Sequence, residues 1–315
     1  MANKILITPK SFYKYQQKPL EMLKAAGYDP IVNTTGQTYS EEEMVEFVKG
    51  SIAGIIVGVD PLPAAVLNHS SHLRAISKYG VGMDNIDLER AKELSIGVKN
   101  AVGANSISVA ELAIGLMFEC SRKLSHHINE VKNTGWDRLL GFELTGKRLA
   151  VIGGGQIGKE VAKRAKGLQM EVSIYDPYFK DISFLQEYDV ELAEELATLL
   201  ELADVISLHL PVTNDTKHLI GKQMLARMKP HAILINTARG ELVDEGALYE
   251  ALSAGHIGAA AQDVYSKEPP EQGDRLIALP NFILTPHLGA FTEEAIERMA
   301  VRSTENLLEL LKGEG

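Results

Sequence analysis

Three clusters in the C-terminal part of the chain carry side chains suited to proton transfer and anion binding. They contain Arg239 in Asn-Thr-Ala-Arg-Gly, Glu268 in Tyr-Ser-Lys-Glu-Pro and His287 in Thr-Pro-His-Leu-Gly. Arginine presents a planar fork of N–H donors that fits a carboxylate, and histidine exchanges a proton near neutral pH. A neighbouring glutamate favours the imidazolium and fixes the tautomer of the ring. Together these residues suit an anionic carbonyl compound as ligand.

The elements that precede these clusters must bring them together. Each cluster follows a predicted strand, at residues 232–236, 259–262 and 283–285. In an open parallel sheet the carboxyl ends of the strands share one edge, and ligands bind there. Taken singly, each residue is more often structural than catalytic, so the prediction of one joint site rests on this convergence.

A glycine-rich turn earlier in the chain predicts a dinucleotide site. Gly153, Gly155 and Gly158 match G-x-G-x-x-G between a predicted strand at 147–152 and a predicted helix at 156–167. The first glycine permits a tight turn, the second lets the backbone approach a pyrophosphate, and the third lets the helix pack on the strand. The helix N-terminus then offers free N–H groups to the phosphates.

An acidic residue follows where the ribose of the dinucleotide would lie. A second predicted strand, 170–175, ends at Asp176, whose carboxylate can accept hydrogen bonds from the ribose hydroxyls. A carboxylate there repels a 2′-phosphate, so Asp176 favours NAD over NADP. Gln156 and Ile157 open the helix and are expected among the cofactor-binding residues.

The pattern of the whole chain predicts an α/β protein with two doubly wound, Rossmann-like parallel sheets. Strand-like and helix-like segments alternate over residues 1–99 and again after the glycine-rich turn. A nucleotide-binding domain at 100–288 would be inserted into a discontinuous substrate domain of 1–99 plus 289–315, with a cleft and a hinge between them. A long helical run is predicted at 106–132 and a final helix at 291–311. The other predicted strands are 4–8, 31–33, 54–59, 74–78, 97–99, 190–192 and 205–208, and the other predicted helices are 19–26, 41–49, 63–69 and 88–94.

Composition and charge disfavour several other classes of protein. Of the 315 residues 45% are hydrophobic and 23% charged, as in ordinary globular proteins. The 32 Lys and Arg residues are scattered, and against 42 Asp and Glu they leave a net charge of −10, so no nucleic-acid partner is expected. Cys120 is the only cysteine, so neither an intrachain disulfide nor a thiolate metal site is expected. No apolar run has the length of a membrane span and the N-terminal stretch fits a strand, so we expect a cytoplasmic protein without a membrane partner.

Together these motifs resemble the NAD-dependent D-2-hydroxyacid dehydrogenase family. The segments around Arg239, at 263–269 and at 285–289 are similar to the arginine, glutamate and histidine signatures of that family. Leu-His-Leu-Pro-Val-Thr at 208–213 resembles the stretch that passes beside the cofactor. Asn-Ser-Ile-Ser-Val-Ala-Glu at 105–111 resembles the passage between the domains. The resemblance covers nearly the whole chain.

The resemblance implies a role for each catalytic residue. His287 would protonate the keto oxygen during reduction and act as base in the reverse direction, while Glu268 would keep His287 protonated. Arg239 would bind the substrate carboxylate and polarise the carbonyl. NAD or NADH would accept or supply the hydride.

The resemblance also implies binding residues. The backbone N–H groups of Gly80, Val81 and Gly82 would hold the substrate carboxylate, with Lys78 and Tyr79 beside them. For Lys78 a contact with the substrate and an ion pair with an acid both stay open. Cofactor contacts are further implied at His209, Pro211, Thr216, Thr237, Ala238, Asp263 and Gly289, where Asp263 either lies near the nicotinamide carboxamide or caps a turn.

The substrate within this family stays open between two kinds of 2-oxoacid. The loop at 78–87 resembles those of phosphoglycerate dehydrogenases and of glyoxylate or hydroxypyruvate reductases. Short phosphoglycerate dehydrogenase-like enzymes are the main interpretation, yet that group tends to place an arginine where this chain reads Gly58-Val59-Asp60. An acid there would repel a phosphate unless Lys78 compensates, so a small unphosphorylated 2-oxoacid is the alternative.

Two further expectations concern binding rather than chemistry. An NAD-sensing corepressor-like protein of the same fold is the alternative of another class, and turnover of any 2-oxoacid separates it from an enzyme. The helical run at 106–132 resembles the arm that pairs nucleotide domains in this family, so a homodimer is expected.

Overall fold

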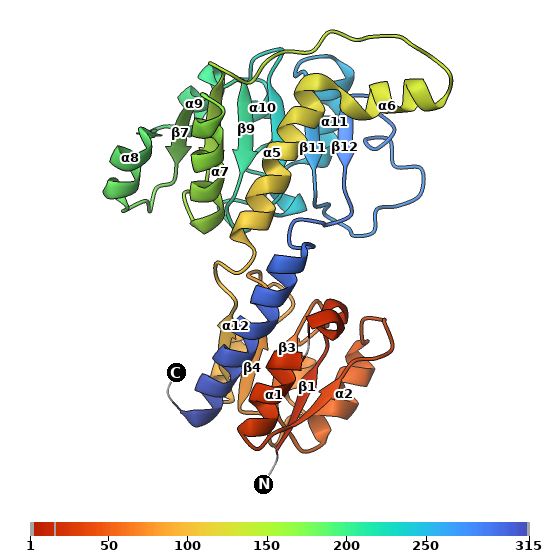
Figure 1. Ribbon diagram of the computed structural model, residues 1–315, viewed down its shortest axis with the longest axis vertical. Helices are drawn as coiled ribbons and strands as arrows, with labels where there is room; N and C mark the ends of the chain where they lie inside the picture. The colour runs from red at the N-terminus through yellow and green to blue at the C-terminus, as the bar shows by residue number, and fades with distance from the viewer. Residues whose placement is uncertain (1–2, 16, 314–315) are drawn as a thin grey trace. The chain divides into compact units, whose positions relative to one another are not determined.

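The computed structural model describes residues 3–15 and 17–313 and divides the chain into two compact units (Figure 1). Unit 1 comprises Met1–Asn105 and Ala290–Gly315, and unit 2 comprises Ser106–Gly289. The predicted boundaries lay at 99/100 and 288/289. Both units are α/β with all-parallel sheets, as the strand–helix alternation predicted. None of the helices in the described residues combines the length and apolarity needed to cross a bilayer.

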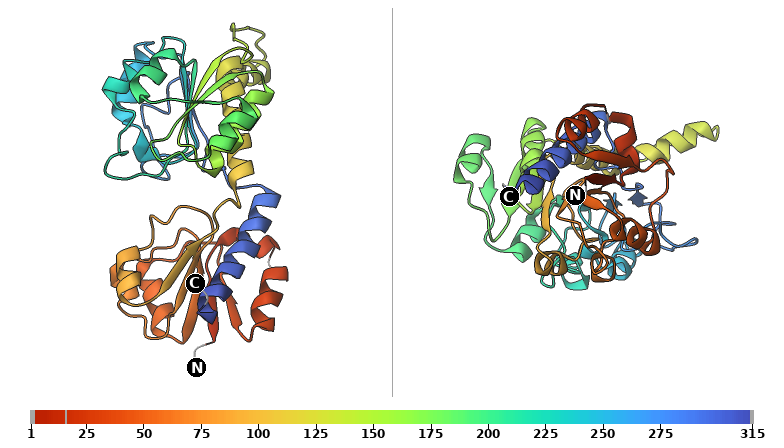
Figure 2. Two further views of the ribbon diagram at one scale, coloured as in Figure 1. Left: turned by 90° about the vertical axis from the view of Figure 1, so that its left-hand side faces the viewer. Right: turned by 90° about the horizontal axis from the view of Figure 1, so that it is seen from below.

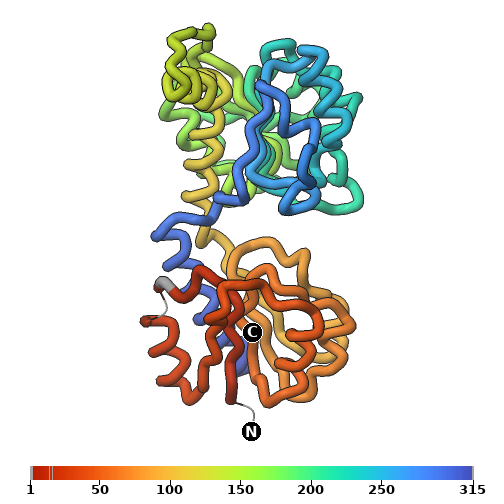
Figure 3. The backbone as a smooth tube through the Cα atoms, turned by 90° about the vertical axis from the view of Figure 1, so that its right-hand side faces the viewer, coloured from red at the N-terminus to blue at the C-terminus, as the bar shows by residue number. Residues whose placement is uncertain are grey.

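Unit 1 is built on a five-stranded parallel sheet in the order β2-β1-β3-β4-β5. One face carries α1 and α12 and the other carries α2, α3 and α4, so the sheet is buried on both sides. In Figure 3 the blue backbone of α12 returns to the red and orange backbone of the first part of the chain. The strands are β1 Lys4–Ile7, β2 Asp29–Val32, β3 Ile52–Val57, β4 Ala75–Lys78 and β5 Gly97–Asn100; the helices are α1 Gln17–Ala25, α2 Glu41–Lys49, α3 Ala64–Leu67, α4 Leu88–Glu93 and α12 Glu293–Lys312, with a 3-10 turn at Lys10–Tyr15.

Unit 2 is built on a seven-stranded parallel sheet in the order β12-β11-β10-β9-β6-β7-β8. The chain leaves β6 toward β8 and then returns to continue from β9 on the other side, which places a topological switch point between β6 and β9. Helices α5 and α7 lie on one face, and α10 and α11 on the other (Figure 2). The strands are β6 Arg148–Ile152, β7 Glu171–Tyr175, β8 Glu191–Leu192, β9 Val205–Leu208, β10 Ile233–Asn236, β11 Ala259–Gln262 and β12 Phe282–Leu284; the helices are α5 Ser106–Arg122, α6 Leu124–Lys132, α7 Gln156–Gly167, α8 Ile182–Tyr188, α9 Leu196–Leu202, α10 Lys222–Leu225 and α11 Glu245–Ser253, with a 3-10 turn at Gly240–Leu242.

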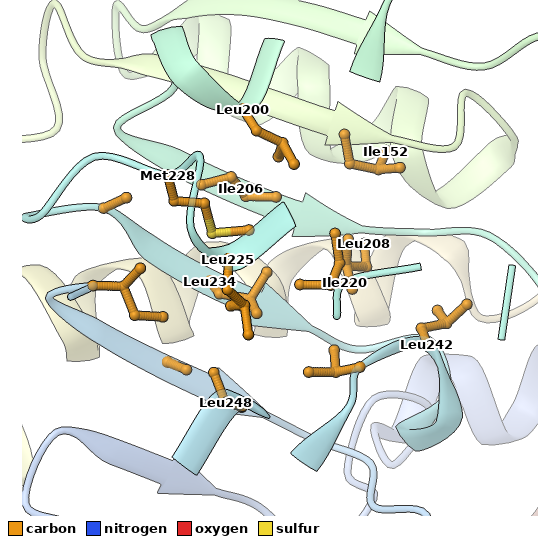
Figure 4. Close-up of a cluster of buried hydrophobic side chains, with 14 of the residues drawn as sticks. Ile152, Leu200, Ile206, Leu208, Ile220, Leu225, Met228, Leu234, Leu242 and Leu248 are labelled. Atoms are coloured by element: carbon orange, nitrogen blue, oxygen red, sulfur yellow. The ribbon is translucent and has the colours of Figure 1, made fainter. Parts of the chain in front are cut away.

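A core of aliphatic side chains holds the central strands of unit 2 to the helices α9–α11. Ile206, Leu208 and Leu234 project from β9 and β10 toward Leu225 and Leu248 of α10 and α11 (Figure 4). Each is at most 1% exposed, and burying such a side chain contributes about 1.5–3 kcal/mol to folding. This packing fixes the positions at which the strands end, and it therefore also fixes where the following loops begin.

The helical run predicted at 106–132 is two helices in the structure. Lys123 adopts a left-handed φ of 52°, so α5 ends at Arg122 and α6 begins at Leu124. Lysine rarely takes this conformation, and no Gly or Pro marks the break. The predicted strands agree with the observed ones to within two residues at each end. The short helices α8 to α11 were not predicted.

Two glycines of α7 allow a test of stability, because replacing each with alanine should change the free energy of unfolding differently. A Cβ at Gly158 would collide with the carbonyl oxygen of Gly153, whereas at Gly167, at the end of the same helix, it would meet nothing within 4 Å. Gly158→Ala should lower the free energy of unfolding by about 1–3 kcal/mol because backbone atoms cannot give way. Gly167→Ala should leave it unchanged or raise it by up to about 1 kcal/mol through helix propensity. Urea unfolding followed by circular dichroism measures both, and equal effects would refute the close packing at Gly158.

Candidate active site

The carboxyl edge of β10, β11 and β12 carries the three predicted catalytic residues. Asn236 at the end of β10 pairs with Gln262, and Gln262 pairs with Leu284, so the three strands end level with one another. Arg239, Glu268 and His287 lie in the three loops that follow. The structure thus brings their loops to one edge of one sheet.

His287 and Glu268 form a hydrogen-bonded pair. The Nδ1 atom of His287 lies 2.8 Å from Oε2 of Glu268, and the backbone N–H of Tyr265 donates to Oε1 of Glu268 at 2.9 Å. The two side chains are 52% and 39% exposed, so solvent and ligands reach them. With Nδ1 engaged, Nε2 is the ring nitrogen that can face a ligand.

The pair shifts both of its pKa values in the direction of an ion pair. The hydrogen bond to Glu268 raises the pKa of His287 above its ordinary value and outweighs the opposing effect of burial. Burial alone would raise the pKa of Glu268, but the hydrogen bonds from His287 and from the Tyr265 N–H lower it. At neutral pH this arrangement favours an imidazolium beside a carboxylate.

Arg239 projects from a tight turn that Asn236 organises. The side chain of Asn236 accepts from the Ala238 N–H at 3.0 Å and donates to the Arg239 carbonyl at 2.8 Å. The arginine itself donates from Nη1 to the Ala238 carbonyl at 2.7 Å. At Gly240 an added Cβ would collide with the backbone of residues 265 and 266, so the arginine turn lies directly against the loop that carries Glu268.

A second carboxylate holds the glutamate loop, and sequence reasoning missed it. Glu245, the first residue of α11, accepts a hydrogen bond from the Ser266 N–H at 2.8 Å. The Tyr265 hydroxyl donates to Asp274 at 2.9 Å. An acid in the first turn of a helix is usual, so its type and position gave no sign of this contact.

Asp263 organises the turn that bears His287. It is 1% exposed, and its carboxylate accepts hydrogen bonds from the N–H groups of Leu288 and Gly289, both at 2.7 Å, and from the Thr285 hydroxyl at 2.5 Å. His287 has a left-handed φ of 53° within this turn. Of the two roles left open by the sequence, the structure displays turn capping, and a contact with nicotinamide stays a prediction.

The glycine-rich turn has the geometry that the dinucleotide pattern requires. Gly153 has a φ of 99°, and a Cβ there would collide with the His209 carbonyl. Gly155, the residue before α7, faces open space, so a phosphate can approach its backbone. The carboxylate of Asp176 accepts from the N–H groups of Gly154 and Tyr178, both at 2.9 Å, and is thereby fixed at the end of β7.

Two buried polar atoms without a partner lie at the carboxyl edge of the sheet of unit 2, after β9 and its neighbour β10. Within the described residues, Nδ1 of His209 and the Thr237 hydroxyl make no hydrogen bond, and both residues come directly after paired strands, β9 and β10. Burial lowers the pKa of His209 to about 3, so its ring is neutral, and Nε2 contacts the Ser207 hydroxyl at 2.8 Å. Such atoms fit a polar ligand like a dinucleotide, because buried polar groups normally find a partner. Thr216 instead caps its own turn by donating to the Pro211 carbonyl at 2.8 Å.

In unit 1 the side chains of Lys78 and Tyr79 point into the protein. Lys78 is 7% exposed and donates to the Gly58 carbonyl at 2.5 Å and to Oδ1 of Asn85 at 2.6 Å. The Tyr79 hydroxyl donates to the Ile296 carbonyl at 3.1 Å, and burial raises its pKa to about 12. Both side chains therefore support the loop that begins at Gly80.

The carboxylate of Asp60 is also hydrogen-bonded within unit 1. It is 2% exposed, and its carboxylate accepts hydrogen bonds from the Tyr39 N–H at 2.8 Å and from the Thr8 hydroxyl. The neighbouring Val59 is 71% exposed. Asp60 therefore does not project its carboxylate toward a ligand, and the solvent-facing side chain at this place is apolar.

The described residues contain no cluster of three or more His, Cys, Asp or Glu side chains that could hold a metal ion.

Known proteins resemble this chain in both sequence and structure. The family model "D-isomer specific 2-hydroxyacid dehydrogenase, NAD binding domain" matches residues 114–289, which lie within unit 2. D-3-phosphoglycerate dehydrogenase of Methanocaldococcus jannaschii is 44% identical over 283 residues, which are 89% of this chain and 53% of that protein. Hydroxypyruvate reductase of Thermotoga maritima is 38% identical over 284 residues, 89% of this chain and 91% of that protein.

A solved structure extends the likeness to the whole chain. D-lactate dehydrogenase from Aquifex aeolicus, complexed with NAD and lactic acid, superposes with a TM-score of 0.84 at 28% identity, covering 98% of this chain and 96% of that one. The chain spans about half the length of the phosphoglycerate dehydrogenases of Methanocaldococcus jannaschii and Archaeoglobus fulgidus that it matches, 53% and 52%.

The histidine–glutamate pair generates a titration test. In Glu268→Gln the pKa of His287 should fall, because a neutral amide stabilises the imidazolium less than a carboxylate does. NMR titration of the His287 ring measures this directly. Glu271→Gln is the matched control, since Glu271 is exposed and pairs with Lys267 at 2.7 Å. An unchanged His287 pKa in Glu268→Gln would show that the pair does not set the charge of the ring.

Proposed function

Because the chain belongs to the D-isomer specific 2-hydroxyacid dehydrogenase family, we propose that it transfers a hydride between nicotinamide and a D-2-hydroxyacid or its 2-oxoacid. The observation that carries this proposal is the 2.8 Å contact between His287 and Glu268, which raises the pKa of the imidazole and suits it to the role of a proton donor. Residues 114–289 match the NAD-binding domain of the family, so NAD is the cofactor.

The proposed chemistry assigns one task to each side chain. Nε2 of His287 gives a proton to the keto oxygen during reduction, and the neutral ring takes it back during oxidation. Glu268 raises the pKa of His287 and so stabilises the protonated ring, which is the form that serves as the acid during reduction. Arg239 binds the carboxylate of the substrate and polarises its carbonyl through charge-assisted hydrogen bonds. Bound NADH supplies the hydride.

The residues of unit 2 support NAD rather than NADP. The turn at Gly153–Gly158 leaves room for a pyrophosphate at Gly155, and the orphaned atoms of His209 and Thr237 offer polar contacts beyond it. Asp176 keeps accepting capacity for the ribose hydroxyls, since a carboxylate has about four lone-pair sites and two are used here. Its negative charge would repel a 2′-phosphate.

For the substrate carboxylate we propose the backbone of Gly80, Val81 and Gly82. The side chains of Lys78 and Tyr79, which the sequence placed beside the substrate, contribute by supporting this loop, because both are buried and hydrogen-bonded within unit 1.

Two substrate classes remain as candidates within the proposal. A phosphorylated acid related to 3-phosphoglycerate agrees with the relative that is 44% identical. A small unphosphorylated acid such as hydroxypyruvate or glyoxylate agrees with relatives at 38% and 37% identity. Exposed Val59 and buried Lys78 favour the second class, because neither presents a cation to a phosphate at this place.

We further propose a cytoplasmic homodimer formed through α6 and the loop after it. Six large apolar side chains between residues 124 and 140 are exposed by 42–92%, and α6 buries none of its residues. They are Leu124, Ile128, Val131, Trp136, Leu139 and Leu140. In Figure 1 α6 stands out from the body of unit 2. A gathering of exposed apolar side chains on this scale is typical of an interaction surface, and a second copy is the partner that the family resemblance implies.

A panel of 2-oxoacids tests the proposed activity. NADH oxidation followed optically should occur with glyoxylate, hydroxypyruvate, phosphohydroxypyruvate or pyruvate, and His287→Asn should lower kcat by about 10²- to 10⁴-fold through loss of the acid. His256→Asn, an exposed histidine of the same unit, should leave kcat unchanged. No turnover with any acid in the panel would refute the enzyme and favour the NAD-sensing alternative. The preferred acid decides between the two substrate classes.

The dimer has its own test. Trp136→Glu combined with Leu140→Glu should shift the protein from dimer to monomer in sedimentation velocity, because two charges cannot be buried unpaired in an apolar interface. Ile182→Glu in α8, a side chain that is 52% exposed, is the matched control. A wild-type protein that sediments as a monomer at every concentration would contradict the proposal.

A further inference from the structure

The loop after β4 is pinned to the end of β5 by two hydrogen bonds. The register of the two strands pairs Lys78 with Asn100. Beyond that pair, the Ala101 N–H donates to the Gly80 carbonyl at 2.8 Å, and Nδ2 of Asn100 donates to the Val81 carbonyl at 2.6 Å. Two successive carbonyl groups of the loop are therefore turned toward β5.

This arrangement decides where the neighbouring N–H groups point. In a planar trans peptide the N–H is directed opposite to the C=O, and Glu268–Pro269 is the one cis bond found in the described residues. The N–H groups of Val81 and Gly82 consequently point away from β5, side by side. Across residues 3–15 and 17–313, neither donates a hydrogen bond to another part of the chain.

Gly80 and the last helix complete the arrangement. Gly80 has a φ of 123°, which L side chains rarely adopt, so the turn into this geometry depends on glycine. The carbonyl of Asn100 accepts a hydrogen bond at 2.9 Å from Nδ2 of Asn306 in α12, and Asn306 is 5% exposed. Asn100 is thus held by its backbone on one side while its side chain holds the loop on the other.

We propose that Asn100 is a positioning residue for anion recognition. By holding the Val81 carbonyl it keeps the N–H groups of Val81 and Gly82 outward as a ready pair of donors for the two oxygens of a carboxylate. Successive N–H groups of this kind form a concave anion site, and charge-assisted hydrogen bonds are strong. The proposal rests on the proposed function, in which this loop receives the carboxylate of the 2-oxoacid.

The variant Asn100→Asp tests whether the side chain acts by donating a hydrogen bond or only by its size and shape. The two side chains have the same size, but an ionised carboxylate cannot donate and would face the Val81 carbonyl, so the 81–82 peptide is released. We expect KM for the 2-oxoacid to rise about 10- to 100-fold, with kcat changed less than about threefold and the Kd of NADH unchanged in a fluorescence titration. Asn100→Ser keeps a donor on a shorter arm and should show a smaller rise in KM.

Asn68→Asp is the control. Asn68 is an exposed asparagine of the same unit whose Oδ1 accepts from Arg90 at 2.6 Å, and an aspartate preserves that acceptor. Its kinetic constants should equal those of the wild type.

The possible outcomes distinguish a failure of the role proposed for Asn100 from a failure of the proposed function. A folded Asn100→Asp with wild-type KM overturns the role of Asn100 while the enzyme proposal stands. A loss of kcat, NADH affinity and thermal stability together marks a merely structural residue and overturns it as well. If Asn100→Asp does not fold, Asn100→Ser decides by the same split between KM and kcat. If the wild type turns over no 2-oxoacid, the proposed function falls first and the role of Asn100 falls with it.

Discussion

Every loop at the carboxyl edge of these two sheets contains backbone N–H and C=O groups that no neighbouring strand can reach, and buried groups of this kind must find partners. Short side chains at the strand ends supply them. Asn236 serves the arginine turn, Asp263 the histidine turn and Asn100 the glycine loop. Asp60 does the same for the segments around Thr8 and Tyr39. The residues proposed to meet substrate depend on these partners for their positions.

This dependence explains why the polarity of a side chain is a poor guide to its function at the carboxyl edge of a sheet. Asp263 and Asp60 are almost fully buried and have their carboxylates occupied by backbone and hydroxyl donors, whereas Glu268 and His287 are half exposed and occupied mainly by each other. The first two acids shape loops, and the second two groups keep a face toward solvent. The exposure of a side chain and the identity of its hydrogen-bond partner, rather than its residue type, distinguish residues that shape loops from residues that can meet a ligand.

Much of this architecture could be predicted from the sequence, because the signals involved are local. The glycine spacing at Gly153–Gly158 and the apolar runs of the strands predicted the sheets, and their ends placed Arg239, Glu268 and His287 at one edge. The break at Lys123 could not be predicted, since a lysine with a positive φ has no local signature. The contact of Glu245 with Ser266 and the inward orientation of Asp60 depend on segments about twenty residues away or more, so only the folded chain reveals them.

The last long helix belongs to the first unit, and this has a consequence for how the protein is made. Ile296, Met299 and Leu307 of α12 pack in the same core as Ile5 and Ile7 of β1, although all of unit 2 lies between them in the chain. On the ribosome, unit 2 can complete its own core as soon as residue 289 has emerged, because domains generally fold as units during synthesis. Unit 1, although synthesised first, must wait with one face of its sheet covered only in part, by α1, until α12 arrives. During synthesis its early strands therefore expose apolar side chains that α12 covers later, and a chaperone can protect them in the meantime.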